Sequence, residues 1–388
     1  MTHRKTVCIV TGSRSEYGLL KPLIEKFFTD DVFELRLVVT GSHLSEAFGE
    51  TCQEIESDGI SIHAKIELPL DSDTHSAMAR ATGAALISFA EYFENNPPDL
   101  LVVLGDRFEM LAVAIAASMQ QIPIAHIAGG DTSEGAVDEF IRHSITKMSY
   151  LHFTTNDESK NRVIQLGEAP DRVFNVGSLG VDNIMSGTLM SLEELSKNLR
   201  FDLSGEYALV TYHPSTLNDD IDSSELSELL SALTQFPNLK YLFTYANADA
   251  GGRSINKMID SYVKENSNSV AYASLGNIRY LSAMKYAVLV IGNSSSGLYE
   301  TPSFGVPCIN VGGRQKGRLR AENVIDTKPE AEVIKNAIRL ALSYHFKEIA
   351  RNTKSPFGDG KASDMIYRTI VQHLDDGIID LKKAFYVL

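Results

Sequence analysis

The sequence predicts an α/β protein of two domains, each a doubly wound parallel β-sheet covered by helices on both faces, with an interdomain cleft. Two observations predict this class. Short apolar runs alternate with longer amphipathic segments along almost the whole chain, which is the pattern of strands and helices in such a sheet. The chain also has 388 residues, and the alternation weakens only once, near residue 180, before it resumes.

The first domain is predicted to span residues 1–180. Its clearest strand is the run LLVVL at 100–104, whose continuous aliphatic residues are typical of a strand buried on both faces. Leu19, Leu20 and Leu23 show the apolar spacing that predicts a helix. Strands are expected at 6–11, 33–40, 61–65, 100–104, 122–127, 151–154 and 173–176. Helices are expected at 17–28, 44–57, 76–95, 108–119, 138–148 and 156–166.

The second domain is predicted at residues 181–362, followed by a helical segment at 363–388 that is expected to pack back on the first domain. Strands are expected at 207–212, 239–245, 269–273, 288–291 and 306–310, and helices at 225–234, 255–266, 278–286, 330–344 and 363–373. Both domains are therefore predicted to be Rossmann-like. In such sheets, ligands bind at the carboxyl ends of the strands.

Composition and charge restrict the compartment and the partners. A net charge of −14 argues against a general binder of nucleic acid or of membrane surfaces. No apolar run approaches the ~20 residues of a membrane span, and the short apolar run after the first residues is expected to be a strand and not a signal peptide. The three cysteines are scattered without metal-ligand spacing. We expect a cytoplasmic protein without a bound metal.

The most informative stretch is the predicted strand at 288–291 with the turn and helix start that follow it. Small residues in the turn let a ligand approach the backbone, and the first N–H groups of a helix attract anions. Glu300, one turn further on, is suited to accept hydrogen bonds from a ribose. A serine-capped helix followed by a solvated basic loop is the alternative. The expected nucleotide diphosphate site comprises Ser294, Ser295, Ser296, Gly297, Glu300 and the cations Arg314, Lys316, Arg318 and Arg320.

Strand ends of the first domain carry further candidates. Arg14 follows the first predicted strand, His43 the second, and Asp106-Arg107 the most hydrophobic one. Charged residues directly after a buried strand need a reason, because uncompensated charge near a core is costly. The alternatives are a capped helix with a surface arginine at Arg14, and an ion pair that caps the next helix at Asp106-Arg107.

Several carboxylates are expected to converge at these strand ends. Close carboxylates raise one another's pKa, so that one group can accept a proton and another can donate one. Proton transfer at a sugar carbon requires such a pair. The alternative is ion pairing along a solvated helix, since Asp138 and Arg142 are four residues apart. The candidate carboxylates are Asp106, Asp131, Asp138 and Glu139, and candidates at strand ends of the second domain are His213 and, more weakly, Asn247.

Five motifs, taken in order, resemble those of the UDP-N-acetylglucosamine 2-epimerases, specifically the hydrolysing branch of bacterial sialic acid or legionaminic acid biosynthesis. The motifs are GSRSEYG (12–18), LGDRFE (104–109), DEFIRHSITKMS (138–149), GNSSSG (292–297) and GGRQKGR (312–318). The resemblance runs over nearly the whole chain. It implies a fold of glycosyltransferase-B type and an assembly of two or four copies.

The resemblance also implies a reaction and its participants. UDP would bind to the second domain through the serine turn and Glu300, assisted by His213 and Arg314, while Arg14 and Arg107 would position the substrate. Loss of the C2 proton and of UDP would give a glycal, and hydration with protonation from the opposite face would release N-acetylmannosamine. Asp106, Asp138 and Asp131 would carry the acid and base roles. The partners are thus a UDP-sugar and the product UDP, with no metal or other cofactor.

One departure from the family concerns the sugar. Relatives commonly carry a glutamate where this chain has Ala128, so that either Asp131 takes over its role or the position is not needed. A smaller side chain also leaves room for a larger sugar, such as that of UDP-2,4-diacetamido-2,4,6-trideoxyglucose. A UDP-sugar-dependent glycosyltransferase and a non-catalytic sugar-nucleotide sensor are the rival interpretations, since either would explain a UDP site.

Overall fold

The computed structural model describes residues 4–46, 49–70, 72, 74–134, 136–187, 189–214, 219–246 and 251–388. The chain divides into two compact units. The first comprises Met1–Asp131, Val137–Asn183 and Phe357–Leu388, and the second comprises Thr132–Ala136 and Ile184–Pro356. Within the described ranges, no helix is both long and apolar enough to cross a membrane.

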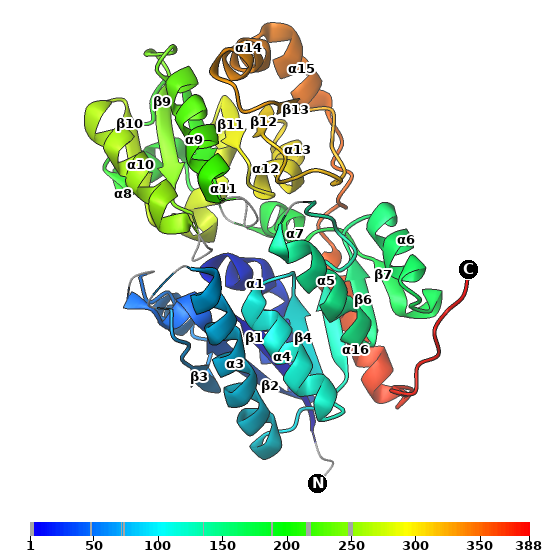
Figure 1. Ribbon diagram of the computed structural model, residues 1–388. Helices are drawn as coiled ribbons and strands as arrows, with labels where there is room; N and C mark the ends of the chain where they lie inside the picture. The colour runs from blue at the N-terminus through cyan, green and yellow to red at the C-terminus, as the bar shows by residue number, and fades with distance from the viewer. Residues whose placement is uncertain are drawn as a thin grey trace. The chain divides into compact units, whose positions relative to one another are not determined.

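The described part of the first unit contains a seven-stranded parallel sheet in the order β3-β2-β1-β4-β5-β6-β7 (Figure 1). Its strands are β1 (Lys5–Thr11), β2 (Phe33–Thr40), β3 (Ala64–Ile66), β4 (Leu100–Leu104), β5 (Ile124–Ile127), β6 (Leu151–Thr154) and β7 (Val173–Asn175). Its α-helices are α1 (Arg14–Thr29), α2 (Cys52–Ser57), α3 (His75–Asn95), α4 (Phe108–Met119), α5 (Val137–Met148), α6 (Asp157–Gln165), α7 (Leu179–Ser186) and α16 (Ala362–Asp375). The boundary between the two units lies within α7, between Asn183 and Ile184. The strand order reverses between the neighbours β1 and β4, and such a switch point is where ligands bind in doubly wound sheets.

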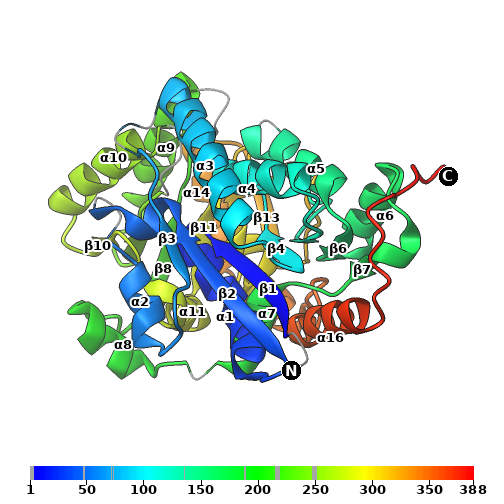
Figure 2. The ribbon, with the colours of Figure 1, turned by 90° about the horizontal axis from the view of Figure 1, so that it is seen from below.

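Alternate residues of the strands supply two core layers of the first unit. On β1, Val7 and Ile9 face the layer that contains α1 and α16, whereas Cys8 and Val10 face the layer that contains α3, α4 and α5. Figure 2 shows these two groups of helices on opposite sides of the strands. The last helix of the chain therefore completes the core around the first strand.

The second unit repeats the same topology. Its described residues form a six-stranded parallel sheet in the order β10-β9-β8-β11-β12-β13, again with the reversal beside its first strand. Its strands are β8 (Tyr207–Thr211), β9 (Lys240–Thr244), β10 (Ser269–Tyr272), β11 (Leu289–Gly292), β12 (Cys308–Val311) and β13 (Val324–Thr327). Its helices are α8 (Leu192–Leu199), α9 (Asp219–Leu233), α10 (Gly252–Glu265), α11 (Gly276–Tyr286), α12 (Ser296–Tyr299), α13 (Thr301–Phe304), α14 (Ala331–Leu342) and α15 (Tyr344–Asn352). The prediction of two doubly wound, Rossmann-like sheets is confirmed.

Two predicted helices differ from the structure for clear reasons. Among the described residues of 44–57, the α-helix is confined to α2, because Gly49 and Glu50 have positive φ values of 86° and 43° and cannot continue a right-handed helix. The helix predicted to start after the turn that follows the strand at 288–291 is split into α12 and α13. Pro302 has no backbone N–H to donate to the preceding turn, and Glu300 lies at the break. The strand β13 and the helix α15 were not anticipated, whereas α7 and α8 lie in the region 177–205, where short helical stretches are expected.

Candidate active site

The switch point of the first unit brings together the loops after β1 and β4. Gly12, Ser13 and Arg14 follow β1, and Ser13 caps α1 by accepting a hydrogen bond from the backbone N–H of Glu16. Asp106 and Arg107 follow β4, after Gly105 with φ of +76°. Because β1 and β4 are paired neighbours, both predicted arginines lie at one edge of the same sheet.

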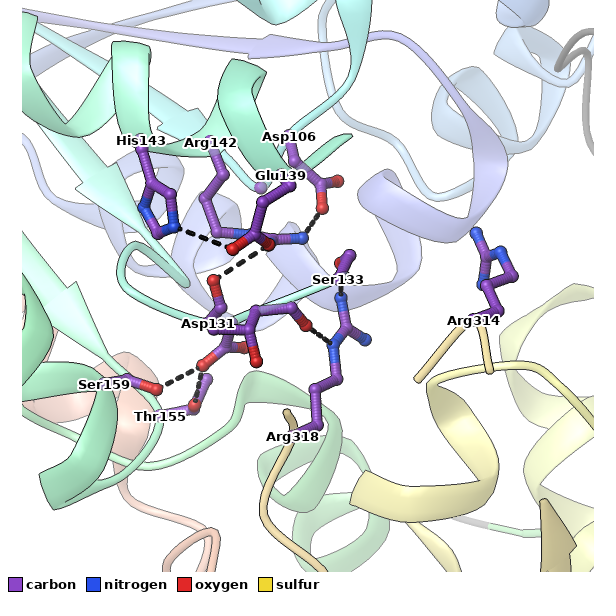
Figure 3. A network of polar contacts seen from close by, with 12 residues as sticks. Asp106, Asp131, Ser133, Glu139, Arg142, His143, Thr155, Ser159, Arg314 and Arg318 are labelled. Atoms are coloured by element: carbon purple, nitrogen blue, oxygen red, sulfur yellow. Dashed lines mark hydrogen bonds and ion pairs between the residues drawn. The ribbon is translucent and has the colours of Figure 1, made fainter. Parts of the chain in front are cut away.

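Arg142 organises the carboxylates at this edge (Figure 3). It lies on α5, its side chain is only 2% exposed, and it forms an ion pair with Asp106. Its Nη1 also lies 3.6 Å from Oε2 of Glu139 and donates to the backbone oxygen of Asp131 at 2.9 Å. Glu139 in turn contacts His143, with 3.2 Å between its Oε1 and Nε2 of the imidazole. A buried arginine thus holds three chain segments that carry acidic residues.

Asp131 and Asp138 flank this arginine in different surroundings. Asp131 is 6% exposed, and its Oδ1 accepts hydrogen bonds from Thr155 Oγ1 at 2.8 Å and from Ser159 Oγ at 2.6 Å. Asp138 is half-buried in the first turn of α5, four residues before Arg142. The hydroxyl donors fix the carboxylate of Asp131, whereas Asp138 keeps contact with solvent.

The other predicted site residues of the first unit are two arginines that form ion pairs and a histidine that is fully buried. Arg14 forms an ion pair with Glu54, and Arg107 pairs with Glu109 at 2.6 Å. His43 is fully buried, with Nε2 3.0 Å from Thr11 Oγ1 and Nδ1 2.8 Å from Thr51 Oγ1. Burial lowers the pKa of His43 to about 3, so the ring is neutral. With both nitrogens engaged by threonines, this arrangement gives no support to substrate binding by His43.

The switch point of the second unit joins the loops after β8 and β11. The side-chain oxygen of Asn293 accepts from the backbone N–H of His213, and its Nδ2 donates to the His213 carbonyl, each at 2.7 Å. Asn293 thereby holds His213, which is 8% exposed, beside the start of the serine turn. The predicted residue Asn247 lies outside the described residues.

The serine turn after β11 is compact. Ser294 Oγ and Ser296 Oγ lie 3.2 Å apart, Tyr280 OH hydrogen-bonds to Ser296 Oγ, and Ser295 is the N-cap of α12. Gly297 permits close packing on the sheet, since a Cβ atom there would lie 2.9 Å from Cys308 Sγ. Hydroxyls and backbone thus crowd one edge of the second sheet, where a phosphate is expected.

Glu300 is a buried acid beside this turn. Its Oε2 has no hydrogen-bond partner among the residues that the structure describes. Burial raises the pKa of Glu300 to about 8. A buried carboxyl oxygen without a partner is costly, and ligand hydroxyls are the donors that would satisfy it.

The sequence predicts that the four cations of the basic loop after β12 belong to the diphosphate site, but in the structure their side chains have different partners. Arg314 Nη1 lies 3.3 Å from the Asn293 carbonyl, next to the serine turn. Arg318 donates instead to the Thr132 carbonyl at 2.6 Å and to Ser133 Oγ at 2.7 Å. Lys316 pairs with Glu134, and Arg320 pairs with Asp326. Lys316 and Arg318 are therefore committed to protein groups of the segment Thr132–Ala136, which packs within the second unit.

Comparison with known proteins identifies the family. A sequence model described as UDP-N-acetylglucosamine 2-epimerase matches residues 26–371, most of the chain. The chain belongs to the UDP-N-acetylglucosamine 2-epimerase family. The resemblance carried by the five sequence motifs is thereby confirmed.

Two relatives and one solved structure illustrate its place in this epimerase family. The chain is 43% identical to a GDP/UDP-N,N'-diacetylbacillosamine 2-epimerase (hydrolyzing) of Campylobacter jejuni, and the match covers 84% of this chain and 85% of the relative. It is 41% identical to the polysialic acid biosynthesis protein P7 of Escherichia coli, over 91% and 90% of the two chains. The crystal structure of UDP-GlcNAc 2-epimerase from Neisseria meningitidis bound to UDP-GlcNAc shares the fold, with a TM-score of 0.81 at 19% identity over 95% of this chain and 100% of that one.

Ala128, where a glutamate is expected from the family resemblance, has a backbone in the left-handed region. Its φ is +61°, and its N–H donates to the Phe153 carbonyl of β6 at 2.8 Å. A residue with a Cβ atom is strained in this left-handed region. The position is half-buried beside β5, and its methyl group presents no acid or base.

Sequence reasoning missed three members of the site. Arg142 was assigned only to helix pairing, although its buried position makes it the centre of the acidic cluster. Glu109 and Tyr280 were not singled out. Glu109 is part of the motif LGDRFE, so this motif could have identified it. No sequence pattern around Tyr280 indicates its contact with Ser296.

Proposed function

We propose that this UDP-sugar 2-epimerase is of the hydrolysing kind and converts UDP-N-acetylglucosamine and water into N-acetylmannosamine and UDP. The acidic cluster around Arg142 carries the proposal. A protein that only binds UDP, or that transfers a sugar from it, does not need several carboxylates at the switch point of its first sheet. Similarity to a relative whose name includes "hydrolyzing" supports water as the second substrate.

The proposed reaction has two stages. A carboxylate removes the C2 proton, the electron pair of that bond forms the C1–C2 double bond, and the C1–oxygen bond breaks to release UDP. Water then adds its oxygen to C1, and a proton returns to C2 from the opposite face. We assign these proton transfers to Asp106, which pairs with Arg142, and to Asp138, which lies four residues before Arg142 on α5, with Asp131 as the third member.

The second unit would hold the nucleotide. Ser294, Ser295, Ser296 and Gly297 would bind the diphosphate with Arg314, and His213 would assist. Glu300 would accept hydrogen bonds from the ribose hydroxyls, which its buried Oε2 lacks among the described protein groups. In the first unit, Arg14 and Arg107 would position the rest of the substrate.

UDP-N,N'-diacetylbacillosamine, which is UDP-2,4-diacetamido-2,4,6-trideoxyglucose, is the second candidate substrate. The name of the Campylobacter jejuni relative favours it, and the small side chain of Ala128 leaves room for a larger sugar. The chemistry at C1 and C2 is the same for both sugars.

The deciding experiment offers each UDP-sugar in deuterated water and follows the products by NMR. Free sugar with inverted C2 that carries deuterium, together with UDP, is expected from the true substrate. Asp138→Asn is expected to cut turnover on the order of a hundredfold or more with UDP binding intact, because a missing general base or acid typically costs that much. Asp171→Asn, an exposed acid of the same unit, is the control and is expected to be fully active.

Two outcomes would contradict the proposal. Turnover of neither sugar without an acceptor would favour the glycosyltransferase, and near-normal turnover by Asp138→Asn would remove Asp138 from the mechanism. The assembly of two or four copies stays a prediction, which light scattering on the purified protein checks.

A further inference from the structure

Glu109 is a buried acid that the proposed reaction does not use. It lies in the first turn of α4, three residues after Asp106, and none of its side chain is exposed. Its Oε1 accepts a hydrogen bond from Nε of Arg107 at 2.6 Å. Its Oε2 is also buried and lacks a hydrogen-bond partner within the described part of the chain. Burying an ionisable group is costly, so this carboxylate requires an explanation.

The same carboxylate oxygen meets three strand-end loops. A Cβ atom on Gly12, after β1, would lie 2.5 Å from Glu109 Oε1, and one on Gly41, after β2, would lie 3.1 Å from it. Arg107 comes from the loop after β4, and β2, β1 and β4 are neighbours in the sheet. The lack of side chains at Gly12 and Gly41 makes room for Glu109 at the switch point.

A second buried acid lies against the same loop. Glu16 of α1 accepts a hydrogen bond from the Gly12 backbone N–H, with 2.7 Å between nitrogen and Oε2. Burial and, next, the nearby charge of Glu109 raise the pKa of Glu16 to about 8. The guanidinium of Arg107 is the cation that pairs with Glu109 beside this second acid.

The contact with Glu109 restricts the orientation of Arg107. A guanidinium group is planar and its N–H donors form a rigid fork. When Nε is bound to a buried carboxylate, the plane of the whole group is set, including its terminal NH2 groups. Arg107 itself is largely buried, with 14% of its side chain exposed, which limits other orientations further.

We propose that Glu109 is a positioning residue, which fixes the plane of the Arg107 guanidinium and packs the loops after β1 and β2 against it, so that Arg107 meets the sugar part of the UDP-sugar in one orientation. This inference rests on the proposed function, in which Arg107 contacts the substrate.

The test uses Glu109→Gln, Arg107→Lys and the double variant. Glutamine keeps the size and one acceptor oxygen of Glu109 but removes the charge that strengthens the hydrogen bond. We expect kcat/KM for the UDP-sugar to fall by about tenfold to a hundredfold in Glu109→Gln. UDP affinity is expected to stay within about twofold, and the double variant should be no worse than the more impaired single variant. Glu34→Gln is the control and should change nothing, since Glu34 pairs with Arg36 at the surface of the same unit.

A second readout does not depend on turnover. The Nε–H resonance of Arg107, identified by its loss in Arg107→Lys, is expected to shift in Glu109→Gln and to stay unchanged in Glu34→Gln. If Glu109→Gln does not fold, Glu109→Asp replaces it, because aspartate keeps the charge but its shorter side chain withdraws the carboxylate from Gly12 and Arg107. The Arg107 resonance is then expected to shift in Glu109→Asp and to stay unchanged in Glu34→Gln.

The outcomes separate the two proposals. A wild-type protein that releases no UDP from either UDP-sugar contradicts the proposed function, whereas the resonance still reports on the positioning role. An unchanged Arg107 resonance, an unchanged kcat/KM in an active protein, or losses that add in the double variant would overturn the positioning role of Glu109.

Discussion

Glu300 shows how burial alone changes the chemistry of one residue. The side chain is 9% exposed, and burial raises its pKa from the ordinary 4.5 to about 8. At pH 7 the folded chain therefore holds a proton on Glu300 that the unfolded chain has released. Between pH 4.5 and 8 the folded state binds more protons than the unfolded state, so the contribution of Glu300 to stability falls as the pH rises.

Glu300→Gln is expected to reduce this pH dependence. Because one pKa unit corresponds to about 1.4 kcal/mol, the fall in stability that Glu300 causes towards pH 8 is on the order of a few kcal/mol. The melting temperature of the wild type should drop more between pH 5 and pH 8.5 than that of the variant. Calorimetric scans across this range measure it.

The same variant also checks the ribose role. Hydrogen bonds to a charged group are typically worth about 1.5–3 kcal/mol, so UDP should bind the variant roughly tenfold to a hundredfold more weakly at pH 8.5, where Glu300 is ionised. Ser343→Ala, which removes a helix cap of α15 in the same unit, is the control for a general loss of stability. Equal UDP affinity in Glu300→Gln and wild type would exclude Glu300 from nucleotide binding.

At the residue scale, the sequence predicts at which strand ends the candidate site residues lie, but not how each side chain is used. Asp106 and Asp138 follow from their places after a strand and at a helix start. The roles of Lys316 and Arg318 do not follow, because their partners Glu134 and Thr132 lie far away in the sequence. Local charge patterns contain no information on such tertiary contacts.

At the scale of elements, the strand β11 ends at a residue that only glycine fits. Gly292 has φ of +144°, and a Cβ atom there would overlap the carbonyl oxygen of Thr211 on the neighbouring strand β8. Gly292→Ala must therefore separate two paired strands at the switch point. We expect a loss of about 3 kcal/mol or more in the free energy of unfolding, beyond the usual range of single substitutions.

Thermal unfolding of the second unit measures this loss, with Gly313→Ala as the matched control. Gly313 lies in the loop after β12, and a Cβ atom there would have no neighbour within 4 Å. The control should remain within about 0.5 kcal/mol of the wild type. Equal melting temperatures for the two variants would show that the packing of β11 on β8 tolerates a side chain.

The elements themselves were predictable where a long pattern repeats. The strand at Leu100–Leu104 is predictable because its residues are continuously aliphatic and buried, and the helix at His75–Asn95 is predictable because its apolar residues keep helical spacing over the whole element. The helix expected at 44–57 failed because single left-handed residues such as Gly49 and Glu50 interrupt a helix without changing its apolar spacing.

At the scale of the whole molecule, the first unit depends on the end of the chain. Ile366, Ile370 and Leu374 of α16 are buried in the core of that unit, and Tyr367 packs on Phe27 of α1 with 5.0 Å between ring centroids. The helical segment at 363–388 is expected from the sequence to pack back on the first domain, but alternation of strands and helices alone does not determine which core receives a terminal helix. The packing of apolar faces decides that.

Asp182 of α7 fastens this helix. Its Oδ1 accepts from the Ala362 backbone N–H at 2.9 Å and its Oδ2 from that of Ser363 at 2.6 Å, and the side chain is 2% exposed. Asp182→Ala leaves two buried donors at the start of α16 without this acceptor. Each such donor costs about 1–3 kcal/mol, so we expect the first unit to lose roughly 2–6 kcal/mol and its melting temperature to fall by about 5–20 °C.

Hydrogen exchange and thermal unfolding distinguish this fastening from an ordinary helix cap. Thr74→Ala is the matched control, because Thr74 caps α3 in the same unit by a local contact with Ala77 and is exposed. The control should lose only about 1 kcal/mol, with unchanged protection of α16. In Asp182→Ala the amides of α16 should exchange faster than those of α1, because the end of the chain loses its anchor before the core around β1 opens. If Asp182→Ala destabilises the protein no more than Thr74→Ala does, apolar packing alone holds α16 on the first unit.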